Sequence, residues 1–145
     1  MLGDSWTDLG TPNAACNHIE CFSFLGENPD DEGIVLVGAR GTAATGPHWF
    51  RSIDYGHTWV DQGAAPSPEW HVMRLVNVGN GVVVGGLGPS DSDVIRSINW
   101  GESFVFKIEL HIQQRSVWGG CYCGNNIVLL GTSGIAWVKP AKVLR

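Results

Sequence analysis

The chain has 145 residues, a length typical of a single domain, and 43% of them are hydrophobic, enough for a sizeable core. Its net charge is −5 and its nine Lys and Arg residues are scattered, so it lacks the basic stripe that binds a phosphate backbone, and we expect no nucleic-acid partner. We also expect no membrane partner and no Sec-type signal peptide, because no run approaches the roughly 20 apolar residues of a spanning helix and the N-terminus lacks a basic region followed by an apolar one.

Glycine and tryptophan are abundant, whereas charged residues are few. The chain contains 20 glycines and 7 tryptophans, and only 16% of its residues are charged. This composition is typical of many short strands joined by tight turns. The sequence therefore predicts an all-β fold.

A nine-residue segment occurs twice along the chain. The sequence RSIDYGHTW at residues 51–59 recurs as RSINWGESF at residues 96–104. A partial third copy, GDSWTDLG at residues 3–10, aligns with GHTWVDQG at residues 56–63. Repetition at such spacing is the signature of a repeat architecture, and here the chain begins in the middle of a repeat.

Apolar runs bounded by glycine lie at matching places between these segments and predict four strands per repeat. The chain opens with a lone fourth strand, then runs from first to fourth strand twice, and ends after a third strand. The expected first strands are residues 18–24, 70–76 and 115–121, the second 33–38, 81–86 and 126–131, the third 48–51, 93–96 and 135–138, and the fourth 5–9, 58–62 and 103–108.

The repeated segment resembles the Asp-box, or bacterial neuraminidase repeat, of sialidases and related β-propellers. The resemblance lies in Ser52, Asp54, Gly56 and Trp59 at the spacing of that motif, and the second copy carries Ser97, Asn99, Gly101 and Phe104. The resemblance implies a turn between the third and fourth strands of a propeller blade, in which the Ser and Asp side chains bond to turn backbone and the aromatic residue packs between sheets. Turn chemistry agrees, since Asp accepts turn N–H groups and Gly adopts positive φ.

The resemblance also implies an architecture of four-stranded antiparallel blades, three per chain. Residues 1–10 would be the closing strand, 11–63 and 64–109 two complete blades, and 110–145 a blade without its fourth strand. Closed propellers have about four to eight blades, so three blades alone leave the ring open. We therefore expect a homo-oligomer, with a six-bladed dimer that exchanges its N-terminal strands favoured over a trimer or a fragment of a longer propeller.

Four residues are candidate ligand-binding positions where the loops of such a ring converge. His18 and His71 share one repeat position, and Trp70 and Arg115 share another. Histidines near a ring centre bind metals or ligands, and an exposed Trp stacks on sugars. The competing interpretations are hydrogen-bonded channel histidines and a Trp packed in the core.

The sequence offers no positive sign of catalysis. The sialidase family uses three arginines, a Tyr–Glu pair and an Asp acid, and its Arg-Ile-Pro motif is missing here. We predict a non-enzymatic structural or ligand-binding module, for a glycan or another protein, without metal or cofactor, in a virion or an extracellular appendage. The alternative is a sialidase-like glycoside hydrolase, which would need acidic residues clustered within the ring.

The four cysteines fall into two close pairs, Cys16 with Cys21 and Cys121 with Cys123. Free buried thiols, two disulfides and a zinc site are all compatible with this count. The spacing of Cys121 and Cys123 is tighter than that of a zinc knuckle.

Overall fold

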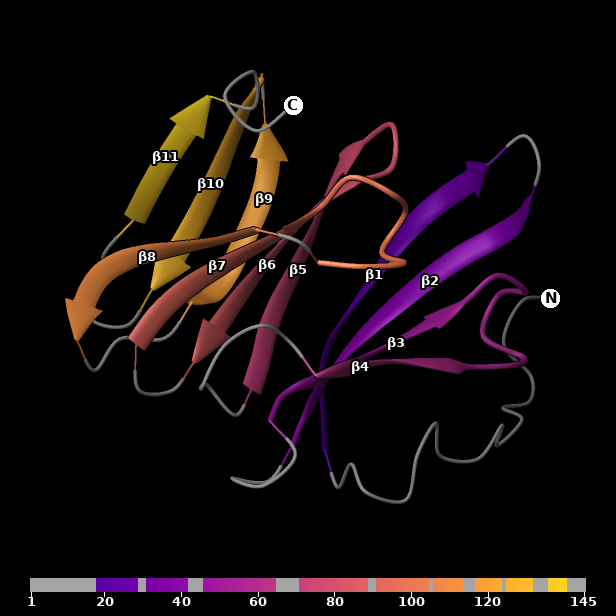
Figure 1. The fold of residues 1–145 in the computed structure, drawn as a ribbon. Helices are drawn as coiled ribbons and strands as arrows, with labels where there is room; N and C mark the ends of the chain where they lie inside the picture. The colour runs from indigo at the N-terminus through magenta and orange to yellow at the C-terminus, as the bar shows by residue number, and fades with distance from the viewer. Residues whose placement is uncertain are drawn as a thin grey trace, which may run out of the picture.

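The structure is a computed structural model that describes residues 18–28, 31–41, 46–64, 71–88, 91–104, 106–113, 117–123, 125–131 and 136–140. Every regular element in these segments is a β-strand, which confirms the predicted all-β class. Figure 1 shows how they are arranged. The strands are β1 (His18–Asn28), β2 (Asp31–Arg40), β3 (His48–Ser52), β4 (Val60–Ala64), β5 (His71–Gly79), β6 (Val82–Gly88), β7 (Asp91–Ser97), β8 (Phe106–Gln113), β9 (Val117–Cys123), β10 (Asn126–Gly131) and β11 (Ala136–Pro140).

The expected first, second and third strands all have counterparts, with ends displaced by a few residues. The fourth strands begin later than expected, because residues 53–58 and 98–102 are occupied by turns and bends. Strand β8 runs from Phe106 to Gln113. The expected strand at residues 5–9 lies outside the described residues.

The described strands form antiparallel meanders in chain order. In the first meander β1 pairs with β2, β2 with β3 and β3 with β4, and β5 to β8 repeat this order. The third meander contains β9, β10 and β11. A single bridge, Arg40 with His71, joins the first two meanders into one curled eight-stranded sheet, while β9 to β11 form a separate sheet (Figure 1).

The first strand of each meander carries an irregularity at the same place. Ladder pairing skips one residue in each case: Glu20 in β1, Met73 in β5 and Trp118 in β9. A β-bulge of this kind bends its strand and increases its twist. The bulges also show how the third meander aligns with the other two. The ladder position of Gly38 and Gly86 is occupied in the third meander by Leu130, and not by Gly131.

The meanders pack face to face through two apolar layers. Alternate residues of β6 enter different layers, which explains why VVVGGLG reads as a continuous apolar run. The layer between the first and second meanders contains Cys21, Leu25, Ile34, Leu36, Trp49, Val72, Leu75, Val83, Leu87, Ile95 and Phe104. The layer between the second and third contains Val76, Val78, Val82, Val84, Val94, Val117, Ile127 and Leu129.

Two glycines set how closely neighbouring meanders approach. A Cβ at Gly38 would lie 2.5 Å from Val72 Cγ1, and one at Gly86 would lie 2.5 Å from the Val117 side chain. Both distances are far below van der Waals contact. Gly38 and Gly86 occupy equivalent positions in their ladders. The first and second meanders therefore approach each other in the same way as the second and third.

We expect Phe104→Ala to lower the free energy of unfolding by about 3–5 kcal/mol, because it empties a buried ring site. Phe104 packs edge-on against Trp49, with ring centroids 4.9 Å apart and an interplanar angle of 82°. Chemical denaturation of both proteins measures the change. Val60→Ala, at a side chain that is 60% exposed, is the control and should change stability by less than about 0.5 kcal/mol. Equal effects of the two substitutions would contradict the packing described here.

Candidate functional site

The turn at residues 52–58 is held by two side chains. The Ser52 hydroxyl donates to Asp54 Oδ1 (2.7 Å) and accepts the backbone N–H groups of Asp54 (3.2 Å) and Gly56 (2.8 Å). Asp54 in turn accepts the Thr58 N–H at Oδ1 (2.8 Å) and the Thr58 hydroxyl at Oδ2 (2.6 Å). These bonds replace the ladder partners that the backbone loses on leaving β3.

The turn at residues 97–103 has the same bonds in spite of its different residues. The Ser97 hydroxyl donates to Asn99 Oδ1 (2.8 Å) and accepts from the backbone N–H groups of Asn99 (3.3 Å) and Gly101 (3.0 Å). Asn99 accepts the Ser103 N–H at 3.1 Å, and its Nδ2 donates to the Ser103 hydroxyl at 3.0 Å. The amide of Asn99 thus takes the place of the carboxylate of Asp54.

Each turn places an aromatic residue over a glycine of the preceding hairpin. Tyr55 and Trp100 both have a φ of 57°, a left-handed conformation that is uncommon for such residues. The backbone N–H of Tyr55 donates to the Gly33 carbonyl (3.1 Å), and that of Trp100 donates to the Gly81 carbonyl (2.9 Å). A Cβ at Gly33 or Gly81 would overlap the aromatic ring above it, so these positions require glycine.

The second turn also contacts the first meander. Trp49 Nε1 donates to the Gly101 carbonyl (3.2 Å), and Arg51 Nε donates to the Trp100 carbonyl (3.0 Å). Gly101 lies against Leu36, where a Cβ would come within 2.4 Å of the leucine side chain. A turn of one repeat is therefore a docking element for the repeat before it.

The aromatic residues that follow the two turns lie in different layers. Phe104 is buried between the first and second meanders. Trp59 is half-buried against Val37, Ala39 and Phe50, on the opposite face of the first meander.

Of the four ligand-binding candidates, His18 and His71 lie among the described residues. Trp70 and Arg115 lie outside them. His18 is exposed and His71 is buried, and both are register partners of Arg40, on opposite sides of β2. His71 Nδ1 lies 3.0 Å from Glu20 Oε1, which links β5 to the bulge of β1.

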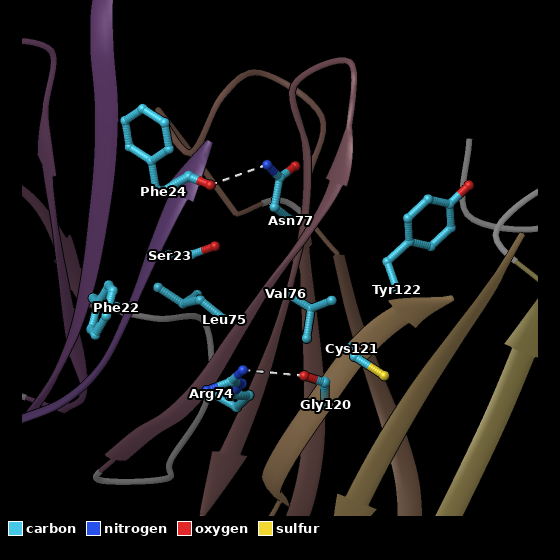
Figure 2. A pocket seen from close by; sticks show the side chains of 10 residues that line it. All are labelled: Phe22, Ser23, Phe24, Arg74, Leu75, Val76, Asn77, Gly120, Cys121 and Tyr122. Atoms are coloured by element: carbon cyan, nitrogen blue, oxygen red, sulfur yellow. Dashed lines mark hydrogen bonds between the residues drawn. The ribbon is translucent and has the colours of Figure 1, made fainter. Parts of the chain in front are cut away.

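A cavity of about 300 Å³ lies instead along the first strands of the three meanders (Figure 2). We call it the inner groove. No backbone ladder joins these three first strands to one another in the described part of the chain, since the Arg40–His71 bridge joins β2 to β5. The groove is lined from β1 by Phe22, Ser23 and Phe24, from β5 by Arg74, Leu75, Val76 and Asn77, and from β9 by Gly120, Cys121 and Tyr122.

Two polar side chains of β5 link the walls of the inner groove. Asn77 Nδ2 donates to the Phe24 carbonyl (3.2 Å), and Arg74 Nη2 donates to the Gly120 carbonyl (3.3 Å), as the dashed lines in Figure 2 show. Arg74 Nε is buried and has no hydrogen-bond partner among the described residues, and no ion pair of Arg74 is found with any of them. The wall of the groove thus contains a guanidinium group whose Nη2 is bonded to the Gly120 carbonyl.

Three of the residues that line the groove are aromatic, namely Phe22 and Phe24 of β1 and Tyr122 of β9. The ring of Phe22 lies on the face of β1 that points away from β5, because its ladder partner Val37 lies on that face. Phe22 is 70% exposed, and Phe24 and Tyr122 are also exposed. Phe24 stacks on Tyr55, with centroids 6.3 Å apart and an interplanar angle of 23°, so the first turn borders the groove as well. Large exposed apolar rings beside polar donors are typical of binding surfaces.

None of these lining residues is among the four predicted ligand-binding positions, although the sequence carries a signal for two of them. Arg74 and Asn77 interrupt the apolar run HVMRLVNV, in which polar side chains have to face a gap between sheets or solvent. Nothing in the sequence indicated that Phe22 and Phe24 would be exposed, because their alternation with Cys21 and Ser23 resembles that of an ordinary half-buried strand.

Three cysteines lie within the described residues, and none of them is in a disulfide. Cys121 and Cys123 are exposed, whereas Cys21 is buried and its thiol donates to the Val72 carbonyl (3.2 Å). Cys16 lies outside the described residues. Burial raises the pKa of the Cys21 thiol from 9.0 to about 12, so this thiol stays protonated at neutral pH.

Comparison with known proteins gives no family assignment. No protein-family model matches the chain, and no curated protein sequence matches it. Within the described segments, no helix is long and apolar enough to cross a membrane.

We expect Asp54→Asn to reduce the loss of stability in acid. Hydrogen bonds from the Thr58 hydroxyl, the Thr58 N–H and the Ser52 hydroxyl lower the pKa of Asp54 from 3.8 to about 2. A carboxyl with a depressed folded-state pKa contributes stability above its unfolded pKa and loses it as the pH falls through the folded value. Between about pH 5 and about pH 2 the melting temperature should therefore fall less in D54N than in the wild type. Asn99→Asp is the converse control and should make the fall steeper. Identical falls in all three proteins would show that the turn carboxylate contributes nothing.

Alkylation should separate the cysteines by burial. With iodoacetamide at about pH 8, Cys121 and Cys123 should be labelled in the native protein, whereas Cys21 should be labelled only after unfolding. Peptide mass spectrometry reads each site. Labelling of native Cys21 at the rate of Cys121 would mean that the layer between the first two meanders opens readily.

Proposed function

We propose that the chain is a non-enzymatic ligand-binding module, built as three blades of a β-propeller whose ring is completed by further copies of the chain, and that the inner groove is its binding site. The groove carries this proposal, because exposed aromatic residues and the guanidinium-bearing Arg74 are among the residues that line it. Such a surface suits a glycan or a protein segment with an acidic group.

The blade assignment is supported by equivalences between meanders. The two turns share their hydrogen bonds, the three first strands share a bulge position, and Gly38 and Gly86 make the same close approach. In a propeller the first strand of each blade is the innermost, so β1, β5 and β9 would line the central channel. The inner groove would then open into that channel.

Completion of the ring by further copies is supported by the two outer meander faces. Equivalent positions are buried where meanders meet within the chain and exposed at its ends. Ile19 is 49% exposed, whereas its ladder equivalents Val72 and Val117 are fully buried. Association of the end faces would remove this apolar surface from water.

A screen for binding and for turnover tests the proposed activity. The wild-type protein should bind members of a glycan array that contains neutral, sulfated and sialylated glycans, and it should not hydrolyse 4-nitrophenyl glycosides. Hydrolysis would favour the glycoside hydrolase alternative. A protein that neither binds nor hydrolyses would leave a scaffold role only.

The groove itself is tested with Arg74→Met, which keeps the aliphatic stem and removes the guanidinium. We expect at least a tenfold loss of affinity for the glycan bound by the wild type, since a charge-assisted hydrogen bond contributes about 1.5–3 kcal/mol. Arg51→Met removes a guanidinium that bonds to the turn at residues 97–103, and it should leave the affinity unchanged. Equal affinity of R74M and the wild type would remove the inner groove as the site.

A further inference from the structure

Cys121 and Cys123 lie two residues apart on β9, and the ladder with β10 fixes the position of both backbones. Cys121 pairs with Val128, and Cys123 pairs with Asn126, with no irregularity between the two pairs. Side chains two residues apart in a strand lie on the same face. The two thiols are therefore neighbours on one face of β9, and we call them the β9 cysteine pair.

The face that carries the β9 cysteine pair points away from the second meander. Ile127 and Leu129, which alternate with Val128 along β10, are buried in the layer between the second and third meanders. Val128 and its ladder partner Cys121 lie on the opposite face. In agreement with this alternation, Cys121 and Cys123 are both exposed. Both thiols are thus open to a ligand from solvent.

The spacing of the pair keeps its two thiols from forming a disulfide with each other. Two residues of an antiparallel strand span about 6.8 Å, so their Cβ atoms, which point the same way, lie about that far apart. A disulfide needs Cβ atoms about 3.5–4.5 Å apart. Neither thiol is in a disulfide. The pair therefore remains available as two thiol ligands.

A metal ion can bridge this gap where a sulfur–sulfur bond cannot. Two metal–sulfur bonds of about 2.3 Å each put the sulfurs of a linear two-coordinate site about 4.6 Å apart. Side chains in strands lean along the strand direction in their common rotamers, so two thiols that lean toward each other are closer than their Cβ atoms. The β9 cysteine pair thus suits a cation that takes two sulfur ligands in a line.

The donor set also selects the kind of cation. Thiolates favour soft cations, among which Cu(I) is stable with two thiolate ligands. A structural zinc ion takes four ligands. In the ranges that the structure describes, no group of three or more His, Cys, Asp and Glu side chains could hold a metal ion. The described residues therefore offer a two-sulfur site, which matches Cu(I) better than zinc.

We propose that Cys121 and Cys123 form a bidentate site for a soft monovalent cation, Cu(I). On binding, each sulfur forms one bond to copper and releases its proton to solvent, and the oxidation state of copper does not change. The ladder with β10 holds the two ligands in place before the metal arrives, which favours one ion bound by both sulfurs over two ions bound singly. Both ligands belong to one chain, so the site does not depend on the proposed ring.

Competition with the Cu(I) chelator bicinchoninate, under anaerobic conditions, measures the affinity of the pair. The wild type should take up one Cu(I) per chain, and Cys121→Ser and Cys123→Ser should each raise the dissociation constant at least tenfold, because the remaining sulfur binds alone. Cys16→Ser leaves the pair intact, and it should leave the affinity unchanged.

A relocated thiol tests the geometry with the number of cysteines kept constant. Tyr122→Cys combined with Cys123→Ser moves the second thiol to the opposite face of β9. This variant should bind Cu(I) no more tightly than C123S, with unchanged far-UV circular dichroism. Wild-type affinity of the relocated variant, or two Cu(I) ions per wild-type chain of which each serine variant loses one, would show that the thiols act independently and would overturn the site. A wild type that takes no Cu(I) from the chelator would also overturn it, and the proposed ring and inner groove would still stand.

Discussion

The hydroxyl group of one serine holds each turn closed, and the packing of neighbouring meanders depends on the closed turn. Ser97 accepts the N–H groups of Asn99 and Gly101 while donating to the Asn99 side chain, and so closes the turn around its own Oγ. That closure holds Trp100 in its left-handed conformation and directs the Trp100 and Gly101 carbonyls outward. Those carbonyls are the acceptors for Arg51 and Trp49 of the preceding meander. The turn thereby makes contacts with residues about fifty positions away in the sequence.

The turns and the bulges have a combined effect, because both depend on the alternation of side chains between the two faces of a strand. A ladder with a two-residue period presents one set of side chains to each neighbouring sheet, and a one-residue slip would reverse the sets. The bulges at Glu20, Met73 and Trp118 fall at equivalent ladder positions, so all three meanders keep the same phase. This phase places Val82 and Val84 in one layer and Val83 and Leu87 in the other.

Among the described residues, the sequence was sufficient to predict the first, second and third strands and the two turns, because both depend on local residues. Gly-bounded apolar runs and the Ser-x-Asp/Asn-x-Gly spacing are readable within about ten residues. The inner groove was not predictable in this way, since Phe24, Asn77 and Tyr122 come from strands that share no ladder with one another. The burial of His71 against Glu20 has the same origin. The sequence did not place the third meander in register with the other two, because an apolar run such as residues 126–131 does not show which of its residues pair with the neighbouring strand. In the structure Leu130 occupies the ladder position of Gly86.

The inner groove owes its shape to the way its strands are held apart. β1, β5 and β9 are spaced on one side by the contacts of Gly38 with Val72 and Gly86 with Val117. On the groove side, bonds from Asn77 to Phe24 and from Arg74 to Gly120 cross the same gaps. A backbone ladder between these strands would have consumed the carbonyls that Asn77 and Arg74 use. The side chains of β5 therefore link the neighbouring first strands. The polar contacts across the groove are a consequence of first strands that approach one another without backbone pairing.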